Sequence, residues 1–398
     1  MLAAMPPTPA AAEPRPGPSD RTRGDACPGA LRLHTADDGA LARVRLPGGL
    51  LTDRQAVLLA ELAERLGDGA LELTSRGNVQ LRGLPADSGA ELGAVLREAG
   101  LLPSETHERV RNIVASPLAG LDGARRADVR SWVGELDRLL CASPVAAGLA
   151  GLFLFALDDG RGDVAALDAD VTLIATPGGG ALLRLGRAVT ARRVAPGDEA
   201  SAALAAAEEF LAAAGGTAWF VRDAPHLLDA GAEPLPALTG RPPAPGPFPG
   251  GLVVGTRFGR VTADQWRELA AAASELRITP WRSVVLPGAT GPAPDGLLAT
   301  PGTAWERATA CTGAPGCAKS LADVRADAAR ALTRGVPGLP VHWSGCERRC
   351  GHPAGEWVDV LATGQGYRVT AHRNDGQTSQ DLTTEQMAEA VAEARRTT

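Results

Sequence analysis

The chain has 398 residues, of which 44% are hydrophobic and 22% are charged, a composition typical of a globular protein with two or three domains. Its 40 basic and 46 acidic residues give a net charge of −6, which argues against a nucleic-acid binder that relies on phosphate neutralisation. No signal peptide is visible, and the longest apolar run, 145–157, is too short to span a bilayer. We therefore expect a cytoplasmic protein without a membrane segment.

Residues 1–25 are rich in Pro, Ala and Arg, which predicts a disordered tail. Two similar halves follow. In the first, Thr52 and Gln55 have the spacing of a capping box and predict a helix that ends before Gly67. In the second, Thr262 and Gln265 repeat the box.

Each of these helices leads into a strand-like segment, 71–83 in the first half and 276–288 in the second. Aligned without a gap, the segments match at Thr74/Thr279, Val79/Val284, Leu81/Leu286 and Gly83/Gly288. This duplication predicts an approximate two-fold relation with a cleft between the halves. Seven prolines in 229–250 predict an extended linker.

The remaining patterns alternate between strand and helix. Strands are predicted at 151–157 and 168–176, joined around the turn 158–161. A helix capped by Ser320 is predicted to run to about Arg334, followed by a short strand at Val341–Trp343 and a last helix that begins after Thr383. These elements indicate an α+β fold.

The segment 76–82 alternates polar and small or apolar side chains. Arg76, Asn78, Gln80 and Arg82 fall on one face of the predicted strand. A half-buried strand with a solvated face would explain this pattern. Two guanidiniums and two amides without a carboxylate in the segment would also suit a ligand that carries several carboxylates. Arg111 and Asn112 add a second arginine and amide pair.

Four cysteines near the C-terminus have the spacing C-x5-C, 28 residues, C-x3-C: Cys311, Cys317, Cys346 and Cys350. Four thiolates suit an iron–sulfur cluster, structural zinc or two disulfides. The spacing between Cys311 and Cys317 is wider than in most zinc sites, and a reducing compartment disfavours disulfides. Both observations favour the iron–sulfur cluster. Cys27 and Cys141 lack a partner at ligand spacing and are expected to be small buried hydrophobic residues.

The motifs T-S-R-G-N-V-Q-L-R-G at 74–83, V-R-N-I-V at 110–114 and the cysteine pattern together resemble the sirohaem-dependent nitrite and sulfite reductase superfamily. The resemblance covers nearly all of 26–398. It implies a duplicated architecture with two ferredoxin-like half-domains and two α/β cluster-type domains related by a pseudo-two-fold. By this resemblance, only the C-terminal half binds a [4Fe–4S] cluster, and first-half arginines hold the carboxylates of a macrocycle.

The resemblance divides the chain into six parts. It places the first ferredoxin-like half-domain at 26–118 and a cluster-type domain without a cluster at 119–228. The linker at 229–250 is followed by the second ferredoxin-like half-domain at 251–300 and the cluster domain at 301–398, after the tail at 1–25.

Within the superfamily, Cys27-Pro-Gly, Leu46-Pro-Gly-Gly49, the segment 276–282 and the segment 344–353 resemble the precorrin-3B synthases of aerobic cobalamin biosynthesis. This resemblance implies a polycarboxylate tetrapyrrole substrate, precorrin-3A, bound by Arg76, Asn78, Gln80, Arg82, Arg111 and Asn112. It also implies hydroxylation at C20 with γ-lactone closure, electrons from the cluster, and molecular oxygen activated at a candidate mononuclear non-haem iron. No spacing among the six histidines identifies ligands for that iron, and no catalytic residue can be named.

Lysine usage argues against a sirohaem-dependent reductase. The reductases use lysines beside the sirohaem, one of them in a K-F motif, and this chain has Leu152-Phe153 there and a single lysine, Lys319. Arginine keeps its proton and cannot replace lysine as a general acid. A sirohaem reductase and a non-catalytic tetrapyrrole-binding or electron-transfer protein remain the alternatives. Because Gly178–Gly180 lacks the dinucleotide fingerprint, a separate donor, a reductase or ferredoxin, must supply electrons.

Overall fold

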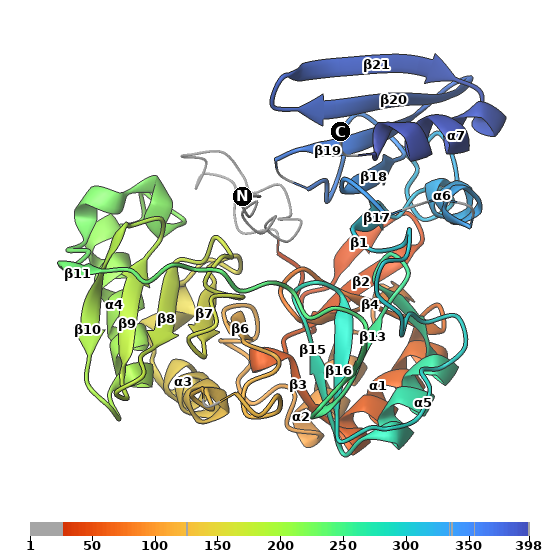
Figure 1. Ribbon diagram of the computed structural model, residues 1–398. Helices are drawn as coiled ribbons and strands as arrows, with labels where there is room; N and C mark the ends of the chain where they lie inside the picture. Colours follow the sequence, from red (N-terminus) through yellow and green to blue (C-terminus); the bar gives the residue numbers. More distant parts are fainter. Residues whose placement is uncertain (1–26, 125, 334, 336, 354, 397–398) are drawn as a thin grey trace.

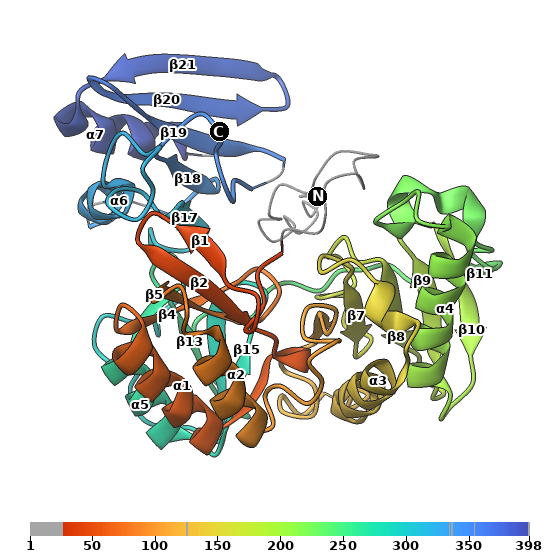
Figure 2. The same cartoon turned by 180° about the vertical axis from the view of Figure 1, so that it is seen from behind.

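The computed structural model describes residues 27–396 apart from 125, 334, 336 and 354, so the tail predicted for 1–25 lies outside the described residues. The described part is a mixed α+β fold, as predicted, with four sheets and seven α-helices. Two sheets and their helices form a central pair, and one α/β unit extends from this pair on each side (Figure 1; Figure 2 shows the reverse face).

The two central sheets have the same strand order and exchange one strand with each other. The first sheet has the order β1 (His34–Ala36), β2 (Gly39–Val44), β5 (Val79–Leu84), β4 (Ala70–Leu73), β14 (Arg260–Thr262). The second has the order β12 (Gly246–Phe248), β13 (Gly251–Gly255), β16 (Ser283–Pro287), β15 (Glu275–Ile278), β3 (Leu50–Thr52). Strand β14 of the second half therefore completes the first sheet, and β3 of the first half completes the second.

The predicted capping boxes are present directly after the exchanged strands. Thr52 Oγ1 accepts the backbone N–H of Gln55, and Thr262 Oγ1 accepts that of Gln265, at 3.2 Å in both halves. These boxes begin α1 (Asp53–Leu66) and α5 (Ala263–Ala272), which pack together below the two sheets, while α2 (Gly89–Glu98) lies beside α1. The capping residues thus fix where each exchanged strand turns into its helix.

The tight turn that joins β4 to β5 in the first central sheet is repeated between β15 and β16 in the second. Thr74 N–H donates to Asn78 O, and Thr279 N–H donates to Ser283 O, both at 2.9 Å. Within these turns Gly77 has φ 65° and its counterpart Arg282 has φ 57°. The left-handed conformation costs a non-glycine residue about 1 kcal/mol, so the second half keeps the turn despite its side chain.

The two α/β units share one topology, in which the first three strands are parallel and the later ones antiparallel. The first unit contains β6 (Ile113–Ala115), β7 (Phe155–Asp158), β8 (Val171–Ala175), β9 (Ala181–Leu185), β10 (Thr190–Val194) and β11 (Glu233–Pro234), with α3 (Arg130–Ala142) and α4 (Glu199–Ala214). The C-terminal unit contains β17 (Ala308–Ala310), β18 (Val341–Ser344), β19 (Trp357–Thr363), β20 (Gly366–Arg373) and β21 (Gly376–Leu382), with α6 (Val324–Leu332) and α7 (Thr384–Ala394). The predicted duplication therefore extends to all four sheets.

Three details differ from the sequence predictions. The helix predicted from Ser320 begins at Val324, because Asp323 accepts the N–H of Ala326 (3.0 Å) while the Ser320 hydroxyl donates to Ala322 O. Strands β7 and β8 are shorter than predicted and pair in parallel, so the turn after β7 does not close a hairpin. The range 229–250, predicted as a linker, contains the short edge strands β11 and β12.

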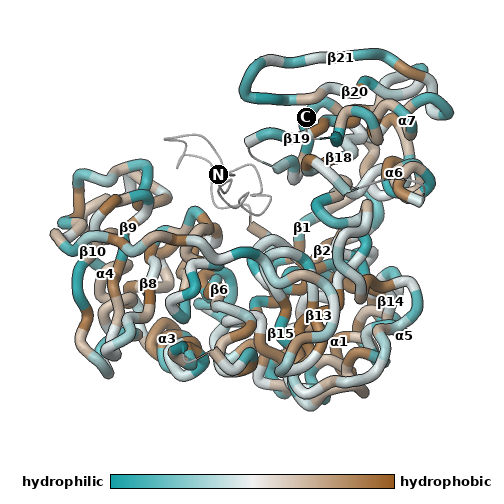
Figure 3. Tube along the Cα trace, viewed as in Figure 1, coloured by the Kyte–Doolittle hydropathy of each residue, from teal (hydrophilic) through white to brown (hydrophobic). Residues whose placement is uncertain are grey.

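Buried apolar side chains form one core shared by the two central sheets and a separate main core in each α/β unit. Leu59 of α1 and Trp266 of α5 both belong to the shared core and are fully buried. Figure 3 shows this apolar interior in brown, whereas polar residues continue along the exposed edge strand β21. Among the described residues, no helix is long and apolar enough to cross a membrane.

Candidate functional site

Two of the four C-terminal cysteines follow neighbouring parallel strands. Cys311 comes directly after β17, and Cys346 comes two residues after β18. Because parallel strands end at the same edge of a sheet, both cysteine segments leave the C-terminal unit there. The N–H of Cys311 donates to Trp343 O (2.9 Å), and the N–H of Gly345 donates to Cys311 Sγ (3.2 Å).

Loop hydrogen bonds bring the other two cysteines to the same edge. Leu321 N–H donates to Gly345 O (2.9 Å), which joins the segment after Cys317 to the segment before Cys346. The turn between Cys346 and Cys350 is anchored by Arg349, whose Nε donates to Asp359 Oδ2 on β19 at 2.6 Å. Cys350 is the exposed member of the set, and the other three are half-buried.

The pKa values of Cys311 and Cys350 depend in part on the charges of other cysteines of the set, as expected for side chains that face a common space. Burial raises the pKa of Cys311, and the charge of Cys350 raises it further, while the N–H of Gly345 lowers it. Burial also raises the pKa of Cys350, as do the charges of Cys346 and Cys317, and Arg348 opposes them. Binding of a cationic metal centre would remove this mutual repulsion by stabilising all four thiolates.

The donor set fits an iron–sulfur cluster. The four C-terminal cysteines are free thiols, and the N–H of Gly345 already donates to Cys311 Sγ. Across the described residues, no group of three or more His, Cys, Asp or Glu side chains is close enough to hold a single metal ion, so no ligand set for a mononuclear iron is identified. A [4Fe–4S] cluster places iron and sulfide between its four thiolates and therefore spaces them more widely than one ion does.

Aromatic rings surround the Cys346–Cys350 turn. Trp357 stacks between the imidazoles of His352 (5.1 Å between centroids) and His372 (4.8 Å). His342 on β18 is buried, and its Nδ1 is hydrogen-bonded to the hydroxyl of Thr309 at 2.8 Å. Burial, with Arg282 and His352 nearby, lowers the pKa of His342 to about 3, so its imidazole is neutral.

The predicted macrocycle-binding residues are all buried, and their two asparagines hold loops together. Asn78 Oδ1 accepts the N–H of Leu46 (2.9 Å), and its Nδ2 donates to Asn112 Oδ1 (3.4 Å). Asn112 in turn donates to the carbonyls of Arg109 and Gly151, at 2.9 Å each. Arg76 lies in the duplicated turn, where its N–H donates to Thr74 Oγ1. The structure thus brings Asn78 and Asn112 together.

Two arginines of this set, Arg82 and Arg111, are paired with carboxylates from other segments. Arg82 binds Asp38 through two hydrogen bonds (2.9 and 2.8 Å), and Arg111 binds Asp137 in the same way (2.6 and 2.7 Å). Gln80 donates to Glu72 on the adjacent strand β4 (3.1 Å). To bind these guanidiniums through the same two nitrogens, a ligand carboxylate would have to displace Asp38 or Asp137. Asp37-Asp38-Gly39, a typical turn sequence between two strands, was the available signal for Asp38.

The first α/β unit has a serine at the position that Cys311 occupies in the C-terminal unit. Ser116 follows β6 as Cys311 follows β17, and Ser116 Oγ accepts the N–H of Asp159 (3.1 Å), as Cys311 Sγ accepts that of Gly345. Asp159 and Asp163 are buried around the guanidinium of Arg161. This edge therefore contains carboxylates and an arginine where the C-terminal unit has thiols.

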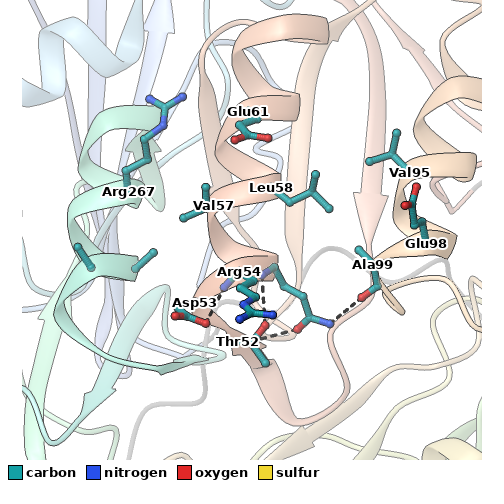
Figure 4. A pocket seen from close by; sticks show the side chains of 13 residues that line it. Thr52, Asp53, Arg54, Val57, Leu58, Glu61, Val95, Glu98, Ala99 and Arg267 are labelled. Carbon is teal, nitrogen blue, oxygen red and sulfur yellow. Dashed lines mark hydrogen bonds between the residues drawn. The ribbon is translucent and has the colours of Figure 1, made fainter.

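A separate surface pocket lies among α1, α2 and α5 (Figure 4). Gln55 lines this pocket, and its side-chain amide donates to Ala99 O at 2.9 Å. The pocket contains none of the cysteines and none of the predicted macrocycle-binding residues. It therefore contributes nothing to the candidate site.

Comparison with known proteins places the chain in a family. Residues 34–99 match the family model described as the nitrite/sulfite reductase ferredoxin-like half domain. The precorrin-3B synthase of a Sinorhizobium species is 30% identical over 387 residues, which cover 88% of this chain and 83% of that protein. The chain belongs to the precorrin-3B synthase family.

The precorrin-3B synthase family shares its first half-domain with nitrite reductases. The ferredoxin–nitrite reductase of Synechococcus elongatus is 40% identical over 105 residues, which cover 26% of this chain and 20% of that enzyme. The structure of the Mycobacterium tuberculosis NirA protein superposes with a TM-score of 0.63 at 20% identity, covering 88% of this chain and 79% of that one. These matches confirm the predicted superfamily and its fold.

Proposed function

We propose that this chain catalyses the oxygen-dependent hydroxylation of precorrin-3A at C20, with closure of a γ-lactone by the ring A acetate, in aerobic cobalamin biosynthesis. One atom of molecular oxygen enters the C20 hydroxyl. The other leaves as water, with two electrons from a separate reductase or ferredoxin. The proposal is supported by membership of the precorrin-3B synthase family and by one observation in particular: four free thiols at one sheet edge beside a strand rich in arginines and amides.

In this proposal Cys311, Cys317, Cys346 and Cys350 hold a [4Fe–4S] cluster, which supplies single-electron transfer when bound. Arg76, Arg82 and Arg111 bind the carboxylates of the tetrapyrrole. Arg111 exchanges Asp137 for a substrate carboxylate, whereas Arg82 stays paired with Asp38 and donates from its third guanidinium nitrogen. Asn78 and Asn112 position these segments, and Gln80 orients Glu72. Candidate ligands for a mononuclear iron are not assigned.

A sirohaem-dependent nitrite or sulfite reductase is the second candidate, because 105 residues of the chain are 40% identical to a ferredoxin–nitrite reductase and residues 34–99 match the nitrite/sulfite reductase half-domain model. Leu152 argues against it, since it occupies the position where those enzymes are expected to carry a lysine that delivers protons. The third candidate is a non-catalytic protein that binds a tetrapyrrole or transfers electrons.

One preparation separates these candidates. The protein is purified anaerobically, iron and sulfide are measured, and sirohaem is sought by acid–acetone extraction. Iron and sulfide without sirohaem, followed by conversion of precorrin-3A under ¹⁸O₂ to a product that carries one labelled oxygen, is the expected result. Stoichiometric sirohaem would establish the reductase instead, and a loaded cluster without turnover would support the third candidate.

A variant pair links the cluster to the assigned cysteines. Cys346→Ser is expected to lose the cluster while the first half stays folded, because the C-terminal unit has its own core. Cys141→Ser, at a half-buried cysteine of the first α/β unit, is the control and should keep its iron and sulfide. Full iron and sulfide in Cys346→Ser would refute the ligand assignment.

A further inference from the structure

The loop between Cys311 and Cys317 belongs to the C-terminal unit, yet the first half contacts both of its ends. Just after Cys317, the N–H of Ala318 donates to Asp37 Oδ2 at 2.7 Å. Asp37 lies in the turn between β1 and β2, next to Asp38. Arg82 on β5 binds Asp38 and reaches Gly316 O at 3.5 Å. The far end of the ligand loop therefore rests on the first sheet.

The near end of the loop is connected to the neighbouring strand β4. Arg325 of α6 donates to Cys311 O (3.1 Å) and, through its other nitrogen, to Glu72 Oε1 (2.6 Å). The second oxygen of Glu72 accepts from Gln80 (3.1 Å). A continuous chain of charge-assisted hydrogen bonds thus runs from β5 through β4 to the carbonyl of a ligand cysteine.

The loop packs closely against the first sheet at Gly316. A Cβ atom added to Gly316 would lie 2.8 Å from Asp38 Oδ2 and 2.7 Å from Thr312 Cγ2. Real Cβ atoms do not approach other atoms so closely, so glycine is needed where the loop meets the first sheet.

The charges at both ends are arranged to keep the contacts ionic. Burial opposes the ionisation of Glu72, but Arg325, with Arg82 and Arg260, lowers its pKa below the ordinary value. Burial opposes the charge of Arg82 as well, yet Asp38 and Glu72 raise its pKa. Both pairs stay charged at neutral pH, and removing one partner would leave a largely buried charge unpaired.

We propose that Asp37, Asp38 and Arg82 at one end, and Glu72 with Arg325 at the other, are positioning residues that hold the Cys311–Cys317 loop in its ligand-binding conformation. The inference rests on the proposed function insofar as that function assigns the cluster to this loop. Preorganised ligands lose less conformational entropy when the cluster binds, so the first half would contribute to cluster retention and potential.

Asp37→Ala tests the far end, because Asp37 is an exposed turn residue whose loss should leave the fold intact. In protein without the cluster, hydrogen–deuterium exchange of peptides spanning 309–323 should be about fivefold faster than in the unmodified chain, as expected for one lost hydrogen bond. Asp37→Asn, whose amide oxygen can still accept the N–H of Ala318, should restore slow exchange. Asp229→Ala is the matched control, since Asp229 also accepts a backbone N–H, that of Gly231, in an exposed loop.

Cluster-loaded protein supplies the second readout. Asp37→Ala and Glu72→Gln should lose iron and sulfide at least threefold faster on exposure to a chelator, with a shifted midpoint potential and an altered spectrum of the reduced cluster. The inference would be overturned if these variants matched Asp229→Ala in hydrogen–deuterium exchange rate, in the rate of iron and sulfide loss, and in midpoint potential. If the unmodified chain takes up no iron and sulfide, the proposed function fails, and the exchange experiment still judges the positioning role.

Discussion

Arginine carries nearly all the positive charge of this chain, 39 residues against one lysine, and several guanidiniums are buried. Arg395 donates to the carbonyls of Leu339, Ala304 and Glu306, and Arg277 donates to those of Pro117 and Ala119. The planar fork of five donors allows one side chain to bind several carbonyls, which the single ammonium of lysine cannot match. The arginine bias is therefore used in the interior as well as at the candidate site.

Asp163 makes the stability of the chain depend on pH. Its carboxylate is buried beside Asp158, and burial with this like charge raises its pKa to about 7. A carboxyl whose pKa is higher in the folded state binds more protons than the unfolded chain, so stability falls as pH rises from about 4 to about 7. Above pH 7 the folded protein carries the full cost of an ionised buried group.

Asp163→Asn should remove this dependence. Between pH 5.5 and 8 the unfolding free energy of the variant should gain about 2 kcal/mol relative to the unmodified chain. The reason is that the unmodified chain loses about 1.4 kcal/mol per pH unit over the roughly 1.5 pH units between 5.5 and 7. Urea denaturation at the two pH values measures the difference. Asp128→Asn is the control: the hydrogen bond from Arg130 lowers the pKa of Asp128, so this carboxyl is ionised in both the folded and the unfolded state from pH 5.5 to 8, and its replacement should change the unfolding free energy equally at the two pH values. An equal effect of Asp163→Asn at both pH values would contradict the argument.

At the level of elements, the two capping boxes should contribute equally, because they occupy equivalent places in the two halves. Thr52→Ala and Thr262→Ala each remove the side-chain oxygen that accepts the N3 amide, and each should cost about 1 kcal/mol of unfolding free energy. Thermal or urea denaturation measures the loss. The corresponding Thr→Ser changes keep the oxygen and should cost less than half as much; equal losses for Ser and Ala would attribute the effect to the lost methyl group.

Local chemistry explains which elements could be predicted from the sequence. The capping boxes at Thr52, Thr262 and Thr383 depend on residues three positions apart, and all three begin helices as predicted. The exchanged strands β3 and β14 have three residues each and pair with the other half, so no local pattern identifies them. Cluster ligation by the four cysteines stays a prediction, and so does macrocycle binding by the arginines and amides of 76–82 and 111–112. The partners of Arg82 and Arg111 lie 44 and 26 residues away, beyond any short-range pattern.

For the whole molecule, the reciprocal exchange of β3 and β14 means that neither half contains a complete central sheet. The core is shared as well, since α1 of one half packs on α5 of the other and both contribute fully buried residues to it. A half expressed alone would expose an unpaired sheet edge and an apolar helix face, two features that promote aggregation. The halves should therefore fold together.

A split between β11 and β12 tests this expectation. In fragments 1–240 and 241–398 produced alone, the central sheet should not unfold cooperatively, because each fragment loses the strand that completes that sheet and half of the shared core. Mixed during refolding, they should form a one-to-one complex that unfolds cooperatively, measured by sedimentation and circular dichroism. The control is the intact chain with a protease site in the same stretch, cut after folding, which should keep its melting transition. A monomeric 1–240 fragment that unfolds as sharply as the intact chain would show that the exchange is dispensable for folding of the first half.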